Sequence, residues 1–181
     1  MAAFNDRYGG CVAGDSIVEL EGGRKCRVAE LRKGDRLRSP AGGSATLELL
    51  VRTGCPSGWA KLVELSEGLR LTAYHPVQLG KEWRFPVDMS EVIEVPCKDL
   101  FSFCLKGSSS AIVGGIPCIA LGHGIKDGAA AHPYFGTSAV LRDLTRFPGF
   151  ESGLVDLSHA CTFRDITGKV CELRVDSSSV A

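Results

Sequence analysis

The sequence has no excess of either charge and no long hydrophobic run. Its 21 Lys and Arg residues equal its 21 Asp and Glu residues, so nothing in the composition favours nucleic acid or an anionic membrane as a partner. No apolar run reaches the ~18–20 residues that a membrane-spanning helix needs, and residues 1–10 contain no apolar signal core. We therefore expect no nucleic-acid partner, no membrane association and a cytoplasmic location.

The eight cysteines also lack the spacing of a metal site. None forms a C-x-x-C pair, and none lies beside two histidines at ligand spacing, so we expect no metal and no cofactor. A chain of 181 residues can bury a core of its own and does not need the disulfide framework that eight cysteines would permit. We expect most of them to be reduced, small buried residues, as in proteins of reducing compartments.

Short apolar segments alternate with frequent turns, because the chain holds 22 glycines and 8 prolines. Many short segments at close spacing are typical of an all-β domain, here through about residue 125. The segment 18–20 followed by Val28 is similar to the segment 77–79 followed by Val87, which indicates two duplicated β lobes. The expected strands are Ser16–Leu20, Val28–Leu31, Arg36–Arg38, Ala45–Val51, Lys61–Leu65, Leu69–Thr72, Pro76–Leu79, Val92–Val95, Leu100–Leu105, Ala111–Val113 and Ile116–Leu121.

The character of the sequence changes after Gly124. Residues 126–131 are small and polar, which predicts a linker, and Thr137–Phe147 is the best helix candidate because Thr137 can cap it and a Pro-Gly pair follows it. Further strands are expected at Gly153–Leu157, Cys161–Ile166 and Lys169–Val175. We divide the chain into an upstream flank (1–10), a β domain (11–125) and a C-terminal extension packed on it (126–181).

Two clusters carry reactive side chains. In the first, Cys11 follows Gly10 and precedes a Gly-Asp-Ser turn; in the second, a strand delivers Thr72 and, three residues later, His75. A thiol reacts through its thiolate and attacks acyl carbons, and histidine is the side chain that most often moves protons. Cys11 lies beside the peptide bond that joins it to Gly10. Attack on the Gly10 carbonyl therefore forms a small ring and costs little translational entropy.

The order of these motifs resembles a known family. CVAGDSIVEL, then RVAELRKGDRL, then LTAYHPV follow the motif order of Hint (Hedgehog/intein) domains, over roughly residues 9–150. LGHG at 121–124 and HPYFGT at 132–137 are similar to Hint domains that accompany von Willebrand A domains. Each motif alone is weak, and their order carries the resemblance. It implies a pseudo-duplicated all-β horseshoe that processes its own upstream polypeptide, without a cofactor.

The resemblance also implies roles for individual residues. Cys11 would attack the Gly10 carbonyl and leave a thioester between Gly10 and the Cys11 sulfur. His75 would hold and protonate the leaving nitrogen, and Thr72 would hydrogen-bond the scissile peptide or its oxyanion. Because an amide is far more stable than a thioester, the fold must strain the bond or protonate that nitrogen.

Departures from the relatives limit the reaction. Splicing inteins end in His-Asn, whereas the corresponding strand here has neither residue and the only asparagine, Asn5, precedes Cys11; splicing that depends on asparagine is thus excluded. Ser102 stands where inteins often have aspartate. Hedgehog domains activate cholesterol with an aspartate, but residues 46–58 hold only Glu48 as an acidic residue. We expect water, a small thiol or an amine as acceptor, and no sterol.

Three further residues are secondary candidates. His123 lies between two glycines and either lines the site or is structural. Cys118 either accepts the acyl group or packs in the core, and Asp15 either assists the chemistry or braces its turn. Each main residue also has an ordinary interpretation: Cys11 as a buried structural cysteine, His75 as a core histidine and Thr72 as a strand residue.

Two other functions stay open at this point. A Hint fold without activity would serve as a binding module, and its sequence pattern of strands and core would look the same. A cysteine peptidase acting on other proteins would need an open cleft, whereas Cys11 already has its own peptide at hand. Loss of self-cleavage on replacing His75 would argue against the binding module.

Overall fold

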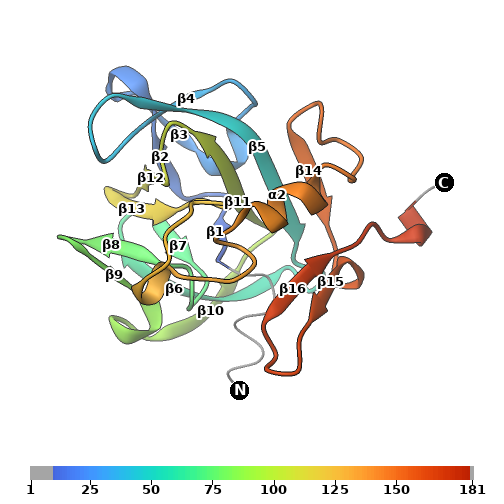
Figure 1. Ribbon diagram of the computed structural model, residues 1–181. Helices are drawn as coiled ribbons and strands as arrows, with labels where there is room; N and C mark the ends of the chain where they lie inside the picture. Colours follow the sequence, from blue (N-terminus) through green and yellow to red (C-terminus); the bar gives the residue numbers. More distant parts are fainter. Residues whose placement is uncertain (1–9, 180–181) are drawn as a thin grey trace.

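The structure, a computed structural model that describes residues 10–179, consists mainly of β-strands (Figure 1). Two large sheets and one hairpin contain the strands, and the described residues include one α-helix, α2 (Ser138–Leu144). The prediction of a mainly β fold is confirmed. Within residues 10–179 no helix is both long and apolar enough to cross a membrane.

The larger sheet brings the start of the described chain between two later strands. In it β1 (Val12–Ala13) pairs antiparallel with β7 (Leu69–Leu71) on one side and with β11 (Asp99–Lys106) on the other. The strand order is β10-β6-β7-β1-β11-β5-β14, with β4 also paired to β5. The other members are β4 (Arg36–Arg38), β5 (Ser44–Gly54), β6 (Trp59–Ser66), β10 (Val92–Pro96) and β14 (Leu154–Leu157).

The second sheet shows the internal duplication. Its order, β3-β2-β12-β13-β8-β9, is symmetric about the β12–β13 hairpin, because β2 pairs with β12 and β8 pairs with β13. Both outer hairpins then lead into a 3-10 turn, Val28–Glu30 after one and Pro86–Asp88 after the other. The predicted repeat corresponds to these two halves. The strands are β2 (Ile17–Glu19), β3 (Lys25–Arg27), β8 (Val77–Leu79), β9 (Glu82–Arg84), β12 (Ser110–Val113) and β13 (Ile116–Ile119).

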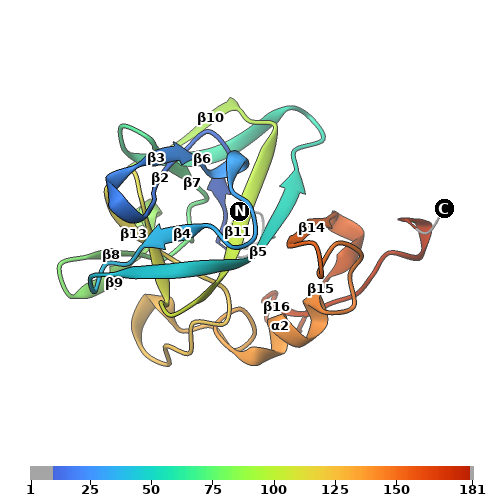
Figure 2. The ribbon, with the colours of Figure 1, turned by 90° about the horizontal axis from the view of Figure 1, so that it is seen from above.

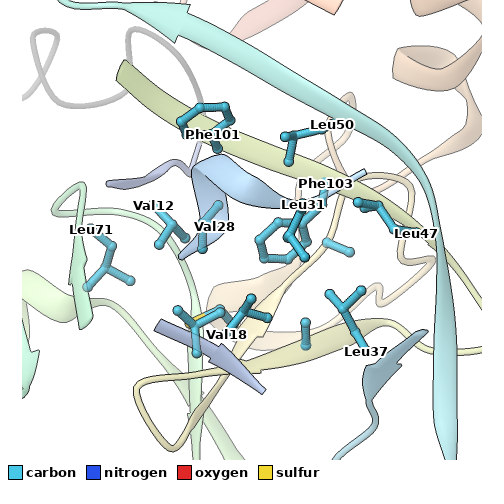
Figure 3. Close-up of a cluster of buried hydrophobic side chains, with 14 of the residues drawn as sticks. Val12, Val18, Val28, Leu31, Leu37, Leu47, Leu50, Leu71, Phe101 and Phe103 are labelled. Carbon is cyan, nitrogen blue, oxygen red and sulfur yellow. The ribbon is translucent and has the colours of Figure 1, made fainter. Parts of the chain in front are cut away.

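The main hydrophobic core lies between the two sheets. Val12 of β1 and Leu71 of β7 pack there with Val18 of β2 and Phe103 of β11, all fully buried (Figure 3). Burying each such side chain contributes about 1.5–3 kcal/mol. Because Val12 and Leu71 are fixed in this core, the residues that adjoin them on β1 and β7 are held in place as well.

The C-terminal part packs against one side of this β core (Figures 1 and 2). There β14 extends the larger sheet parallel to β5. A second hydrophobic cluster joins α2 and the hairpin of β15 (Thr162–Arg164) and β16 (Val170–Leu173) to residues of β5 and β11. Thr137 caps α2, since its hydroxyl accepts the Ala139 N–H at 3.3 Å. The boundary between residues 125 and 126 stays a prediction.

One predicted strand is wrong. Residues 28–31 form a turn, and the strand lies just before them, in β3. The Glu30 carboxylate accepts the Arg27 N–H at 3.0 Å, which closes the turn. The N–H groups of Val28 and Ala29 donate to single carbonyls at the start of the chain, so no ladder forms.

Other boundaries also differ from the predictions. The helix ends at Leu144, and the Phe147 N–H then donates to the Leu144 carbonyl in a tighter turn. The segment predicted as a linker, 126–131, contains a 3-10 turn in which Ala130 is buried. β3 and β9 were not predicted, because they are rich in charged residues and give no apolar signal.

Candidate active site

Cys11 and Thr72 meet where β1 and β7 pair. Val12 lies opposite Leu71 in that ladder, so the adjoining Cys11 and Thr72 come together. The Thr72 N–H donates to the Cys11 carbonyl at 2.9 Å, and the Cys11 N–H donates to Thr72 Oγ1 at 3.0 Å. The Thr72 hydroxyl then donates to the Cys11 carbonyl at 3.3 Å. The N–H of the Gly10–Cys11 peptide is thus held by a hydroxyl oxygen.

Ser102 holds the carbonyl of the same peptide from the other side of β1. It lies on β11, and its Oγ donates to the Gly10 carbonyl oxygen at 2.8 Å. The same Oγ lies 3.4 Å from Cys11 Sγ. Both side chains are buried, with 6% of Ser102 and 2% of Cys11 exposed. One hydroxyl therefore contacts both the carbonyl oxygen and the sulfur that a cysteine-dependent cleavage would join to one carbon.

The His75 ring lies beside Gly10, and its Nδ1 is the ring nitrogen on that side. Its Nε2 is 3.1 Å from the Ile119 carbonyl oxygen; a carbonyl only accepts, so Nε2 carries the proton and Nδ1 of the neutral ring has a lone pair. A Cβ added to Gly10 would lie 2.7 Å from Nδ1. The His75 N–H donates to the Thr72 carbonyl at 3.1 Å. This turn explains the three-residue spacing between Thr72 and His75.

Burial keeps both reactive groups neutral at neutral pH. Burial raises the pKa of the Cys11 thiol from 9.0 to about 11; the hydrogen bond with Ser102 opposes this rise and the nearby Cys55 adds to it. Burial likewise lowers the pKa of His75 from 6.5 to about 4, against backbone contacts with Ile119 and Gly10 that favour the protonated ring. An uncharged thiol and an imidazole that can accept a proton therefore lie beside the same peptide bond.

A cavity of about 670 Å³ opens next to this peptide. Gly10 and Ser102 contribute to its lining, and most of the remaining lining is apolar. Part of it comes from the β core and part from the C-terminal segment, so the cavity lies where the two pack together. The lining includes Tyr74, Phe85, Ile119, Leu121, Ala130 and Phe135. A small molecule in this space would reach the Gly10 carbonyl.

A comparison with known families identifies the domain. The Vint family profile, described as a Hint-domain, matches residues 10–172. The chain belongs to the Hint-domain family. Because the match extends to residue 172, the family includes most of the C-terminal segment of this Hint domain. No curated protein sequence matches the chain.

Solved structures similar to this Hint domain are inteins. The DnaB intein of Synechocystis sp. PCC 6803 matches with a TM-score of 0.50 and 16% identity, over 62% of this chain and 99% of the intein. The Ssp DnaB mini-intein variant M86 gives the same TM-score and identity, over 62% of this chain and 95% of the intein. At this identity the likeness concerns the fold alone. Neither comparison bears on an association with von Willebrand A domains.

The pKa of His75 makes the stability of this Hint domain depend on pH. Its folded pKa of about 4 lies below its ordinary value of 6.5, so between these values the unfolded chain binds a proton that the folded chain excludes. We expect the free energy of unfolding to be highest above pH 6.5 and to fall as the pH drops towards 4, by roughly 3 kcal/mol from this residue. Urea unfolding at pH 7 and pH 4.5 measures it. In His75→Gln the fall in the free energy of unfolding between pH 7 and pH 4.5 should be smaller. An equal fall in the variant and the parent protein would contradict the assignment of this pH dependence to His75.

The secondary candidates lie in different places. His123 lines the same cavity as Gly10, and its Nδ1 accepts the Ile125 N–H at 2.9 Å. Cys118 is fully buried in the main core, and its thiol contacts the Ile116 carbonyl at 3.5 Å. Asp15 forms an ion pair with Arg70 at the surface. Of the three, only His123 shares the cavity with Gly10.

Ser102 is the residue of this site to which the sequence assigned no role. It was noted only as standing where inteins often have aspartate, yet its hydroxyl contacts both the Gly10 carbonyl oxygen and the Cys11 sulfur. A signal exists: Ser102 is the one polar residue within the apolar segment 100–105. A buried hydroxyl in such a strand needs a partner, and here the partner is the Gly10 carbonyl.

Proposed function

We propose that this Hint domain cleaves its own chain at Gly10–Cys11 through a thioester. The observation that carries the proposal is the Ser102 hydroxyl, which lies 2.8 Å from the Gly10 carbonyl oxygen and 3.4 Å from Cys11 Sγ. Membership of the Hint-domain family supports self-processing in general. The arrangement around Gly10–Cys11 supports this particular bond as the one that breaks.

In the first step Cys11 Sγ bonds to the Gly10 carbonyl carbon and the bond from that carbon to the Cys11 nitrogen breaks. One proton must leave the sulfur and one must reach the nitrogen, which becomes a free amine. We assign this transfer to His75, because its Nδ1 has a lone pair and lies against Gly10. Because the pKa of His75 is low, its protonated ring is a strong acid and gives its proton readily to the leaving nitrogen.

Two hydroxyl groups assist this step from opposite sides of the peptide. Ser102 donates to the Gly10 oxygen and would stabilise the negative charge that develops there, an effect typically worth ~3–4 kcal/mol for one donor. Thr72 accepts the Cys11 N–H and would orient the leaving nitrogen. The resemblance gave Thr72 either the scissile peptide or its oxyanion. We assign the oxyanion to Ser102 and the nitrogen side of the peptide to Thr72.

The thioester then passes its acyl group to water, a small thiol or an amine. The cavity beside Gly10 and Ser102 supports this step, since it gives a small acceptor room next to the carbonyl. The absence of any asparagine after Cys11 excludes release by asparagine cyclisation. We therefore propose that the upstream polypeptide ends at Gly10 and that this domain begins with a free Cys11.

The test uses a well-folded reporter fused ahead of Tyr8-Gly9-Gly10-Cys11. Intact masses are recorded over time at neutral pH, alone and with dithiothreitol or hydroxylamine. We expect a reporter that ends at Gly10, released faster with either reagent, since both attack thioesters. A folded fusion that stays whole under all conditions would contradict the proposal and would favour the binding module.

The space around Gly10 predicts which residue can stand before Cys11. A Cβ on Gly10 would lie 2.7 Å from the His75 ring and 2.8 Å from the His75 Cα, so Gly10→Ala must displace the peptide or the backbone. We expect cleavage of the same fusion to slow by about 10- to 100-fold, as for the ~1–3 kcal/mol of overpacking. The control is Gly54→Ala, also before a cysteine, where the new Cβ meets only Asp99 at 3.7 Å. Equal rates in both variants would contradict this role of Gly10.

The cavity predicts a variant that separates thioester formation from release. Ala130 is buried and lines the cavity, so Ala130→Phe should fill part of it. We expect the thiol concentration for half-maximal release to rise by about tenfold, equivalent to about 1.4 kcal/mol. The rate of thioester formation should stay close to that of the parent. Ala41→Phe on an exposed loop is the control; an equal response of the two variants would show that acceptors do not use the cavity.

A further inference from the structure

The Ser102 hydroxyl lies where an acyl group on Cys11 would be placed. Its Oγ is 2.8 Å from the Gly10 carbonyl oxygen and 3.4 Å from Cys11 Sγ. In the thioester the carbonyl carbon is bonded to both of these atoms. Ser102 Oγ would therefore lie close to that carbon, and a small rotation would turn it from a donor to the oxygen into a nucleophile towards the carbon.

We propose that Ser102 takes the acyl group from Cys11 and carries the upstream polypeptide as an oxygen ester. This inference rests on the proposed function, because it begins with the thioester. The bond between the Gly10 carbonyl carbon and Cys11 Sγ breaks, and a bond from that carbon to Ser102 Oγ forms. The hydroxyl proton moves to the Cys11 sulfur, so the step is a simple exchange that needs no oxidant, metal or cofactor.

The surroundings of Ser102 supply what a hydroxyl nucleophile lacks. A serine hydroxyl reacts only when a base takes its proton, and the sulfur that leaves lies 3.4 Å away. Burial holds the pKa of the Cys11 thiol at about 11, so a thiolate released there takes up a proton readily. An oxygen ester is also more stable than a thioester, which favours the transfer.

The cavity would make the ester, and not the thioester sulfur, the group that an incoming acceptor meets. Gly10 and Ser102 belong to its lining, whereas Cys11 does not. An acceptor that enters the cavity would therefore meet the acyl carbon from the side of Ser102. The chain would be joined as a branch at Ser102, with a free amine and a free thiol on Cys11, until that acceptor releases it.

The two acyl states differ in chemistry and can be separated. Thiols cleave a thioester and leave an oxygen ester in place, whereas hydroxylamine cleaves both. The reporter fusion is refolded, treated briefly with dithiothreitol at intervals, quenched in acid and digested with trypsin. For this experiment the fusion keeps Arg7 between the reporter and Tyr8. Cleavage after Arg7, Lys98 and Lys106 then gives the peptide 99–106, to which Tyr8-Gly9-Gly10 stays attached if Ser102 is acylated. The thiol treatment removes any thioester on Cys104 of that peptide.

We expect the acylated peptide 99–106 to survive the thiol and to disappear with hydroxylamine. Ser102→Asn is the matched variant, because its amide group can still donate a hydrogen bond but is no acyl acceptor. The amount of acylated peptide 99–106 that survives the thiol should fall by about tenfold or more in this variant.

Three results overturn the inference. A fusion that releases its reporter with thiol but never yields acylated peptide 99–106 would leave the thioester intact as a proposal and remove the ester. If the amount of acylated peptide 99–106 that survives the thiol were unchanged in Ser102→Asn, the ester would lie on another residue. A fusion that neither releases its reporter nor forms a branch would overturn the proposed function and this inference together.

Discussion

Replacing Cys11 with alanine is expected to abolish cleavage of the reporter fusion. The Cys11 thiol belongs to the residue that directly follows the Gly10 carbonyl. Ser102 Oγ, which contacts the same carbonyl oxygen and the Cys11 sulfur, takes the acyl group only from the thioester in our account. Loss of a covalent nucleophile lowers rates by on the order of 10⁶-fold in well-studied enzymes, which would put cleavage below detection. Intact masses over several days measure the residual rate.

A second cysteine provides the control for this variant. Cys171 is free and exposed on β16 and does not line the cavity beside Gly10, so Cys171→Ala should cleave at the parental rate. Circular dichroism and thermal unfolding confirm that both variants fold. Cleavage at Gly10 that persists in folded Cys11→Ala would contradict the assignment of the nucleophile.

Replacing Ser102 with alanine is expected to slow thioester formation by about 10²–10³-fold. The reason is the loss of the side-chain hydroxyl that donates to the Gly10 oxygen, and single oxyanion donors have effects of this size. The alanine also leaves the Gly10 carbonyl without that partner. The rate is measured as reporter release in excess thiol, so that formation of the thioester limits it.

The matched variant for Ser102 is a buried serine outside the site. Ser16 is 2% exposed, and its Oγ donates to the Arg70 carbonyl at 3.1 Å. We expect Ser16→Ala to lower the free energy of unfolding by about 1 kcal/mol while the folded molecules cleave within about twofold of the parent. If both alanine variants slowed cleavage equally, Ser102 would act through stability and not on the oxyanion.

The order of motifs along the chain was sufficient to predict the β fold and to bring the main site residues together. Leu71, beside Thr72, lies in a predicted strand, whereas no strand was predicted at Val12, beside Cys11. The resemblance alone grouped Cys11 with Thr72 and His75. The sequence showed the three-residue spacing of Thr72 and His75, and the structure explains it by a turn in which the His75 N–H donates to the Thr72 carbonyl. Thr137 was predicted as a cap because its hydroxyl can satisfy an N–H at the start of α2.

Features that depend on contacts between distant segments could not be predicted in this way. Ser102 meets Gly10 only because β11 pairs with β1, 92 residues apart along the chain. The cavity exists because residues after 125 pack beside the β core, and its lining combines both parts. The turn at 28–30 is held by the Glu30 carboxylate and by the carbonyls of Gly14 and Ser16, and these contacts outweigh the strand propensity of Val28.

Two Gly–Cys pairs in this chain allow the central claim, a thioester between Gly10 and Cys11, to be tested inside the folded protein. The sequence contains Gly10–Cys11 and Gly54–Cys55 and no other such pair. The fusion is labelled with ¹³C at glycine carbonyls and ¹⁵N at cysteine, refolded, and followed by NMR experiments that correlate a carbonyl with the next amide. Our account predicts that the Gly10–Cys11 correlation decays while a carbonyl signal typical of a thioester appears, and that the Gly54–Cys55 correlation stays constant. Two correlations that persist with equal intensity in the folded protein would contradict it.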